Sequence, residues 1–419
     1  MSTMSGGECN ESPLGNVAVP PEYIEECRRE FESGGAEGCR KFLEKKDEEW
    51  QTIPLDITVI GNSGVGKSSF INSIRGLNAE HPESATVSVT ECSGVRGEGI
   101  RSYEHPDNPM LKFWDLPGVG TPKFPKDEYL KKIHRPIEEY DFFLLLSSSR
   151  FTENDAWLGK EITELGRKYF YVRTKVADAI SSHKKAYPST HNENAELDKI
   201  RKNIEEELKE NGCENTPVFL IDNYETGMFD FGQLQQQLIG DFKKDKKEAL
   251  ILSMCAHSKE MVQAKAEELR GRIWRAATTS AAVATVPIPG VSIAFDASVA
   301  LVQTKFYFKQ LGLDDDSLKR YAAITRTDFC ALKNIVTRNL GLTVLTIESL
   351  KILLDLIPKS LFIGATMLLE EFSRTIPLIG SLIAAPLSFC GTYIMLKGVL
   401  DLLEKVALEV VNYAKNHGK

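Results

Sequence analysis

The stretch GNSGVGKSS, residues 61–69, decides the fold. It matches the pattern G-x-x-x-x-G-K-[S/T] and lies between an apolar run, LDITVI (55–60), and a helix-forming run, KSSFINSIRGL (67–77). A strand, a glycine-rich loop and a helix in this order surround a phosphate with backbone N–H groups at a helix N-terminus. We therefore predict a nucleotide-binding loop in which Lys67 reaches the β- and γ-phosphates and Ser68 binds Mg²⁺. The expected nucleotide-binding residues of this loop are Gly61, Asn62, Ser63, Gly64, Val65, Gly66, Lys67, Ser68 and Ser69.

A second motif, WDLPGVG (114–120), follows later in the chain. An Asp that closes a buried strand, followed three residues later by Gly, is typical of proteins with such a loop. We predict that Asp115 binds Mg²⁺ through water and that the Gly118 N–H contacts the γ-phosphate. The next residue is Val119, where many small GTPases carry a Gln that orients the attacking water. Fast hydrolysis then needs a group from elsewhere, most simply from a second copy of the chain.

The polar loop between these motifs, PESATVSVTECSGVRGEG (82–99), is expected to act as a switch segment. Such a segment supplies a hydroxyl to Mg²⁺ and the γ-phosphate. Thr86, Thr90 and Ser93 are the candidates, and Thr90 is the one we assign to the metal. Glu91 is the only acid in the middle of the loop and is a candidate catalytic residue, although a solvated loop charge explains it equally simply.

The order of apolar and helical segments predicts the architecture. Strand-like runs alternate with helical segments between residues 53 and about 242, which indicates a mostly parallel α/β sheet. From about residue 245 the sequence is almost continuously helix-forming and strongly apolar. The predicted organisation is a disordered tail (1–20), N-terminal helices that pack on a helical domain (21–50), a nucleotide-binding α/β domain (51–245) and a C-terminal helical domain (246–419).

The charge balance, the cysteine spacing and the N-terminal sequence argue against several classes of function. There are 51 Lys and Arg against 59 Asp and Glu, a formal net charge of −8, which argues against nucleic-acid binding. The eight cysteines show no metal-ligand spacing, and the N-terminal sequence lacks the basic and apolar segments of a secretory signal. We expect free thiols and a cytoplasmic protein.

The stretch YVRTKVADA (171–179) raises the question of which base is read. Proteins that recognise guanine carry Thr or Asn, then Lys, any residue, and Asp. Thr174 and Lys175 fit this pattern, but the fourth position is Ala177 and the acid, Asp178, comes one residue late. Asp178 reads the base only if the loop shifts by one residue.

Together these segments resemble the immunity-related GTPases, interferon-inducible members of the dynamin-like group. The resemblance runs from about residue 22 to 410 and rests on GNSGVGKSSFINSIRGL, WDLPGVGTP, YDFFLLLSS, YFYVRTKV, VFLIDN, VPIPGVSIAFD and LGLDDDSLKRYA. Lys67 places the chain with members that have GKS rather than GMS in the loop. The resemblance implies a Ras-like GTPase domain between N- and C-terminal helical parts, with Mg²⁺ and GTP or GDP as cofactors. It also implies that Asp222 and Asn223 contribute to the nucleotide site.

The chain departs from the family in two places. The family's T-K-V-D motif has Ala at its last position here, Ala177, so two guanine donors lose their acceptor. The family's T-G-V-x-E pattern appears as VSVTE (87–91), which keeps Glu91 but loses the leading Thr.

Two uncharged stretches, 276–295 and 375–396, are long enough to raise the question of a membrane span. Their prolines and glycines favour pairs of helices in a buried bundle, while reversible insertion of one element or a permanent span stay open. Glu348, Lys351, Asp355 and Lys359 form a narrow polar stripe on a neighbouring helix. The acids of GLDDDSLKR (312–320) lack the spacing of a calcium loop and are better explained as a helix start.

Two functions remain. The first is a GTP-hydrolysing, dynamin-like protein that forms homodimers or oligomers across its nucleotide face and associates reversibly with intracellular membranes in cell-autonomous immunity. The second is a nucleotide-gated binding module with weak or no hydrolysis and relaxed guanine selectivity.

Overall fold

The computed structural model describes residues 19–87, 100–120, 124–129, 139–284, 291–341 and 384–418 of the 419-residue chain. These residues form two compact units. The first comprises residues 19–47, 269–284, 291–305 and 384–400, and the second comprises the remaining described residues. The phosphate loop, Asp115 and the Thr174–Lys175 pair of the predicted nucleotide site all belong to the second unit.

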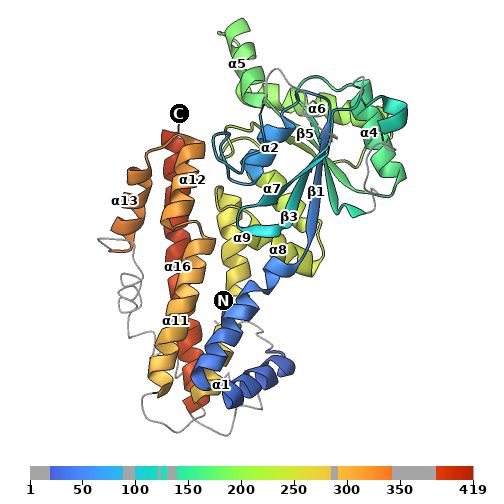
Figure 1. Cartoon of the computed structure of the whole chain (residues 1–419). Helices are drawn as coiled ribbons and strands as arrows, with labels where there is room; N and C mark the ends of the chain where they lie inside the picture. Colours follow the sequence, from blue (N-terminus) through green and yellow to red (C-terminus); the bar gives the residue numbers. More distant parts are fainter. Residues whose placement is uncertain are drawn as a thin grey trace, which may run out of the picture. The chain divides into compact units, whose positions relative to one another are not determined.

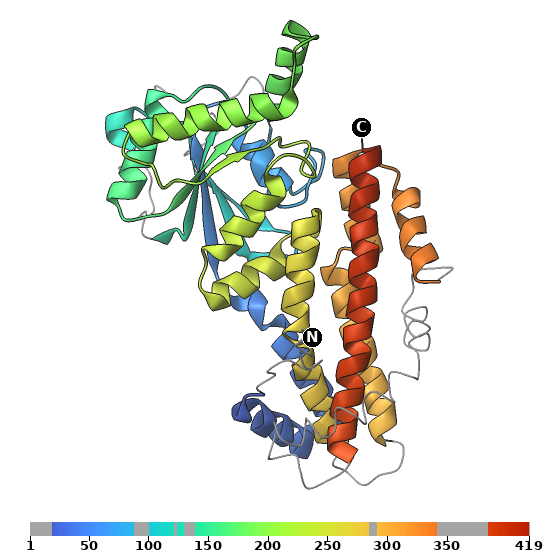
Figure 2. The ribbon, with the colours of Figure 1, turned by 180° about the vertical axis from the view of Figure 1, so that it is seen from behind.

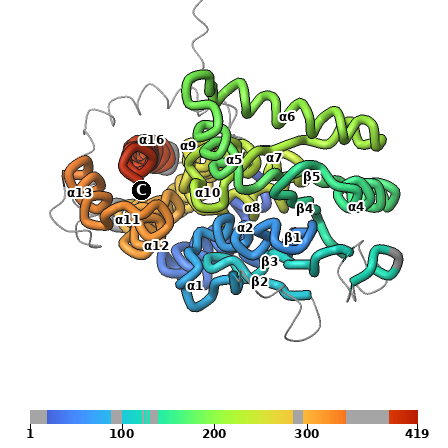
Figure 3. Tube along the Cα trace, turned by 90° about the horizontal axis from the view of Figure 1, so that it is seen from above, coloured from blue at the N-terminus to red at the C-terminus, as the bar shows by residue number. Residues whose placement is uncertain are grey.

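The second unit is built on a six-stranded sheet in the order β2-β3-β1-β4-β5-β6. Figure 3 shows the strands from β2 to β5 side by side in this order. Five strands run parallel, and β2 joins the edge antiparallel to β3. The predicted, mostly parallel α/β sheet is therefore confirmed. The strands are β1 (Leu55–Gly61), β2 (Arg101–His105), β3 (Asn108–Asp115), β4 (Phe142–Ser147), β5 (Tyr169–Arg173) and β6 (Val218–Leu220).

The register of the central strands brings the functional segments to one edge of the sheet. Val59 of β1 lies opposite Asp115, the last residue of β3, and Gly61 lies opposite Leu146 of β4. Because parallel strands all end at the same edge, the segments that follow β1, β3, β5 and β6 gather there. This edge carries the candidate site.

Helices cover both faces of the sheet (Figures 1 and 2). On one face, residues of α4 (Glu153–Glu164), α5 (Val176–Ala186) and α6 (Glu193–Glu210) share a buried core with Phe143, Leu145 and Tyr171. On the other face, Phe70 of α2 (Lys67–Ile74) packs against Phe231 of α7 (Phe231–Gly240), with ring centroids 6.2 Å apart. The central strands are thus buried on both sides, as the continuous apolar runs of the sequence predict.

The second unit also contains helical segments from beyond the sheet. These are α8 (Lys244–Ser253), most of α9 (Lys259–Arg270), α12 (Asp315–Thr325), α13 (Phe329–Asn339) and the C-terminal part of α16 (Ala384–His417). Asp314 caps α12 by accepting a hydrogen bond from the Ser317 N–H at 3.1 Å, which confirms that the acids of residues 314–316 mark a helix start. Arg320 of α12 pairs with Asp107 in the β2–β3 turn at 3.1 Å.

The first unit is helical. Its α1 (Pro21–Glu48) is broken at Gly35, whose φ of 60° and ψ of −150° interrupt the helix where the sequence reads ESGG. Tyr23 of α1 packs edge-on against Trp274 of α10 (Ile273–Ala284), with ring centroids 4.9 Å apart. The unit also contains most of α11 (Val291–Gln310) and the N-terminal part of α16. The uncharged stretch 276–295 is therefore divided between two helices.

Among the described residues, no helix combines the length and apolar character that crossing a bilayer requires. The first part of the second uncharged stretch, 375–383, and the polar stripe at 348–359 lie outside the described residues, while its remaining part, 384–396, belongs to α16.

Candidate functional site

The phosphate loop connects β1 to α2, which begins at Lys67. Gly66 has a φ of 91°, and a Cβ there would lie only 2.9 Å from the Asn223 side-chain nitrogen, so glycine suits both the backbone and the space. Lys67 is 5% exposed, and its Nζ donates to the carbonyl oxygens of Gly61 at 3.3 Å and Asn62 at 3.0 Å. The ammonium therefore lies over its own loop, where the phosphates of a nucleotide would bind.

The side chain of Asn62 anchors the loop from outside. Its amide nitrogen donates to Thr152 Oγ1 at 3.1 Å, and its oxygen accepts from Asn154 at 2.8 Å. Thr152 is the N-cap of α4 and forms a capping box with Asp155. The start of α4 thus holds the loop in place through the Asn62 side chain, and the nucleotide-binding role of Asn62 stays a prediction.

Ser68 and Asp115 meet as the sequence predicts. Ser68 Oγ donates to Asp115 Oδ2 at 2.8 Å, and Asp115 is only 3% exposed. Its second oxygen, Oδ1, is buried and has no hydrogen-bond partner among the described residues. Burial raises the pKa of Asp115 above its ordinary value, while the charge of Lys67 and the Ser68 hydrogen bond oppose this rise.

These two residues fit a Mg²⁺ ion. A buried carboxylate with an unused oxygen next to a hydroxyl is the hard oxygen donor set that Mg²⁺ prefers, and the ion keeps several of its waters. Bound there with a nucleotide, it would neutralise charge on the phosphate oxygens.

Gly118 comes very close to the phosphate loop. A Cβ on Gly118 would lie 2.6 Å from the Ser63 backbone nitrogen, so only glycine allows this approach. The turn is fixed by Tyr129, whose hydroxyl donates to the Pro117 carbonyl at 2.7 Å and which is fully buried. Val119 is 3% exposed and packs in the core with Tyr129, so its side chain faces away from the phosphate site.

The switch loop is only partly described. Thr86 is exposed at its start, while Thr90, Glu91 and Ser93 lie outside the described residues. Their roles stay predictions.

Two loops define the end of the site where a base would bind. Thr174 Oγ1 donates to the Val65 carbonyl at 2.7 Å, and Lys175 Nζ donates to the Gly64 carbonyl at 3.0 Å. Lys175 has a left-handed backbone with a φ of 56°, and α5 begins directly after it. The Thr-Lys pair therefore docks onto the phosphate loop in the unshifted register, which leaves Ala177 at the position of the reading acid.

Asp178 is exposed in the first turn of α5. Consecutive residues of an α-helix point about 100° apart, so Asp178 does not share the direction of residue 177 in this conformation. The structure brings Thr174 and Lys175 to the phosphate loop and leaves Asp178 at the surface.

The second loop follows β6. Asn223 donates from its amide nitrogen to the Gly66 carbonyl at 3.1 Å, and Asp222 accepts from the Tyr224 N–H at 3.0 Å. Sequence reasoning missed Tyr224, which is 63% exposed and whose hydroxyl lies 3.5 Å from Ser69 Oγ. An aromatic residue directly after a polar pair at a strand end was the available signal.

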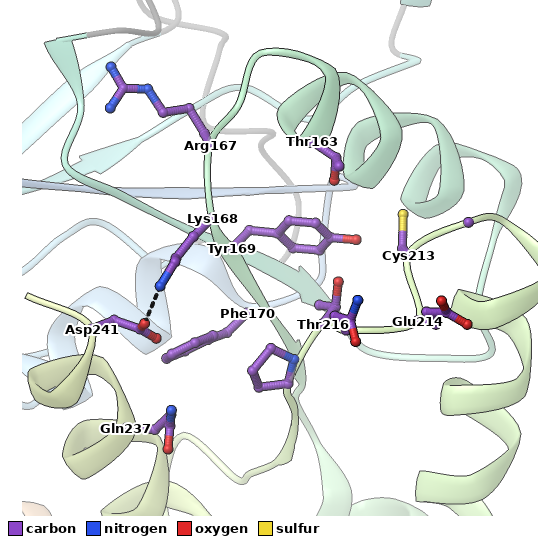
Figure 4. A pocket seen from close by; sticks show the side chains of 13 residues that line it. Thr163, Arg167, Lys168, Tyr169, Phe170, Cys213, Glu214, Thr216, Gln237 and Asp241 are labelled. Carbon is purple, nitrogen blue, oxygen red and sulfur yellow. Dashed lines mark hydrogen bonds and ion pairs between the residues drawn. The ribbon is translucent and has the colours of Figure 1, made fainter.

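A cavity in the described residues lies at the opposite end of the strands, where β5 begins. It has a volume of about 420 Å³ and surrounds the first residues of β5, Tyr169 and Phe170 (Figure 4). An ion pair of 2.7 Å between Lys168 and Asp241 crosses one of its walls. Because the phosphate loop follows the other end of the strands, this cavity is separate from the nucleotide site.

The family model for interferon-inducible GTPases matches residues 20–341. Interferon-inducible GTPase 5 of Rattus norvegicus is 32% identical over 394 residues, covering 94% of this chain and 83% of the relative. Interferon-gamma-inducible GTPase 10 of Mus musculus is 35% identical over 273 residues, covering 65% of this chain and 64% of the relative.

Among solved structures, NFeoB from S. thermophilus bound to GDP.AlF4- and K+ matches with 16% identity and a TM-score of 0.28, over 69% of this chain and 92% of that chain. The fold is established by the order and direction of the strands in the sheet. The sequence matches confirm the predicted family and the enzyme class that it defines. This chain belongs to the interferon-inducible GTPase family.

Proposed function

We propose that this chain binds and hydrolyses GTP with Mg²⁺, self-associates through its nucleotide face, and acts at intracellular membranes in cell-autonomous immunity. The observation that carries the proposal is the contact between Ser68 and Asp115 beside the buried Lys67. Lys67 and Ser68 begin the helix that follows β1, and Asp115 ends β3. Together they provide a cation, a hydroxyl and a carboxylate for a Mg²⁺-triphosphate.

The residues have separate parts in this chemistry. Lys67 compensates the charge of the β- and γ-phosphates, while Ser68 and Asp115 hold Mg²⁺. The Gly118 N–H donates to the γ-phosphate in this proposal, which the close approach of Gly118 to Ser63 of the phosphate loop supports. The Thr-Lys loop supports a purine along the aliphatic part of Lys175, whose ammonium is tied to Gly64.

Self-association is supported by the side chain of Val119, which has no polar group that could orient a water molecule. Its side chain is apolar and packed in the core, so the residue after Gly118 cannot orient the attacking water. We propose that Glu91 contributes to hydrolysis within a dimer whose two copies face each other across their nucleotides. Glu91→Gln should slow turnover and leave nucleotide affinity nearly unchanged.

Phosphate release measured against protein concentration tests the proposal. Turnover per molecule that rises steeply with concentration supports hydrolysis activated by assembly. Equal turnover in dilute and concentrated protein contradicts the part played by a second copy.

A nucleotide-gated module with weak hydrolysis is the second candidate. It is favoured by Ala177 at the base-reading position and by the buried Val119. In this case GTP binds in a Lys67-dependent way, but phosphate release stays at the uncatalysed rate at every protein concentration.

Membrane action and a cytoplasmic location rest on the family resemblance and on the apolar helices of the first unit. Sedimentation of the GTP-bound protein with anionic vesicles, compared with the GDP-bound protein, tests this part. Equal recovery in the supernatant for both nucleotide states would contradict it.

A further inference from the structure

We propose that His183 and His191 form a binding site for a divalent transition-metal ion of the kind that prefers imidazole, such as Zn²⁺. His183 lies in the last turn of α5, and His191 directly precedes Asn192, the N-cap of α6. Their Nδ1 atoms are 2.9 Å apart. This pair is separate from the nucleotide site and has no part in the proposed GTPase function.

The backbone holds both histidines in place. The Tyr187 N–H donates to the His183 carbonyl at 2.9 Å, and the His191 N–H donates to the Tyr187 carbonyl at 2.9 Å. The Tyr187 ring also lies against the His183 ring, with centroids 4.8 Å apart. The turn between α5 and α6 therefore presents the two imidazoles as a fixed pair.

Glu196 gives His183 the form that binds metal. Its Oε2 lies 3.4 Å from His183 Nε2, on the side of the ring opposite His191. When Nε2 carries the proton and faces the carboxylate, His183 Nδ1 keeps its lone pair and, in the metal-free pair, accepts a hydrogen bond from His191 Nδ1–H. An ion that binds both Nδ1 atoms displaces this proton, and His191 then carries its proton on Nε2. A carboxylate that orients an imidazole in this way is the usual partner of a metal-binding histidine.

The distance between the nitrogens suits a shared ion. With metal–nitrogen bonds of about 2.05 Å, two nitrogens 2.9 Å apart subtend an angle of about 90° at the metal. That angle matches the square-planar or octahedral geometry of Cu²⁺ and Ni²⁺. A tetrahedral Zn²⁺ requires about 3.3 Å, which an opening of the pair by about 0.4 Å provides.

The pair supplies two protein ligands. Within the described residues, no group of three or more His, Cys, Asp and Glu side chains is placed to hold a metal. The remaining positions therefore go to water, which can reach the site because the His183 side chain is 26% exposed. A bound ion would join the end of α5, the helix that starts at the Thr-Lys loop, to the start of α6.

Calorimetric titration of the chelator-treated full-length protein with ZnCl₂, without nucleotide, tests the proposal. We expect one Zn²⁺ per chain to be lost in both His183→Ala and His191→Ala and kept in the control His417→Ala, an exposed histidine near the C-terminus. Mg²⁺ should give no heat from this pair, because it prefers oxygen ligands. The exposed Cys330 is present in every variant, so its contribution cancels.

Glu196→Gln keeps both rings and tests the role of the carboxylate. It should weaken Zn²⁺ binding about 10-fold. Circular dichroism in the absence of metal checks that each variant is folded. If the unaltered protein and folded His191→Ala give the same titration, the contact between the rings is only a hydrogen bond and the proposal is wrong.

Discussion

The two ends of the nucleotide site are held by the same loop but offer different chemistry. At the phosphate end, Lys67, Ser68 and Asp115 are all in place and buried or half-buried, and Asp115 keeps an unused oxygen for a cation. At the base end, Thr174 and Lys175 dock on the loop as guanine-reading proteins require, yet the reading position holds Ala177. The framework of the base site is therefore kept while its reading group is absent.

This difference has a physical origin. Phosphate binding depends on backbone N–H groups and one ammonium, which the loop geometry provides for any triphosphate. Guanine reading depends on one carboxylate that accepts two hydrogen bonds, and a single substitution removes it. Tight triphosphate binding and relaxed base selection can thus occur in one site.

The largest expected effect is at the phosphate end. Lys67→Ala removes a buried charge from the β- and γ-phosphates and should weaken GTP affinity on the order of 100-fold or more. Calorimetric titration with Mg²⁺-GTP measures this, and Lys168→Ala, which removes an exposed lysine at the other end of the strands, is the control that should leave GTP affinity unchanged. Unchanged GTP affinity in Lys67→Ala would refute the phosphate-loop assignment.

Removing the metal-binding carboxylate should have a smaller effect. Asp115→Asn takes a charge away from Mg²⁺ and should weaken GTP affinity about 30-fold with Mg²⁺ present, since charge-assisted contacts contribute about 1.5–3 kcal/mol. In EDTA the variant and the unaltered protein should bind equally. A loss of the same size in EDTA would show that Asp115 acts on the fold and not on the metal.

Much of the site could be predicted from sequence, because its parts are fixed by local spacing. The loop around Lys67 and the turn at Gly118 depend on glycine positions, and the link between Ser68 and Asp115 follows from parallel strands ending at one edge. The glycine positions are a local property of the sequence, and the contact between Ser68 and Asp115 is a consequence of the parallel sheet.

Other features depend on tertiary contacts that no local pattern reveals. Strand β2 was not predicted because its edge position leaves only its last residue, His105, buried, so it has no apolar run. The docking of Asn62 on the start of α4 joins residues about 90 positions apart in sequence. The placement of Tyr224 beside Ser69 required β6 to lie next to β5.

A carboxylate placed at the position that recognises guanine should increase the selectivity of the base site for GTP. Ala177→Asp should raise the preference for GTP over XTP about 10-fold, because a carboxylate at this position gains a charge-assisted contact of about 1.5–3 kcal/mol with the guanine donors. Competition against a fluorescent nucleotide measures the ratio. Asp178→Ala is the control and should change the ratio less than about twofold in the unshifted register. If Asp178→Ala abolishes the preference, Asp178 is the reader and the loop does shift.

The smallest effect concerns pH. Burial raises the pKa of Asp115, so this carboxyl keeps its proton to a higher pH than an ordinary Asp. Only the deprotonated form binds metal, so the Mg²⁺-dependent part of GTP affinity should be complete at high pH and fall as the pH drops through that raised pKa. Titrations at about pH 7.5 and 5.5, with Mg²⁺ and with EDTA, check this. A fall of equal size in EDTA would assign the effect to another group.

Competition of GTP, XTP and ATP for the unaltered protein, with Mg²⁺ present, tests the central difference between the two ends most directly. All three should bind through the phosphate end, and GTP should be preferred by no more than roughly 10-fold, since Lys175 supports any purine and no carboxylate reads the guanine donors. A GTP preference on the order of 10⁴-fold over both competitors, as in a site built to hydrogen-bond its ligand, would contradict the account.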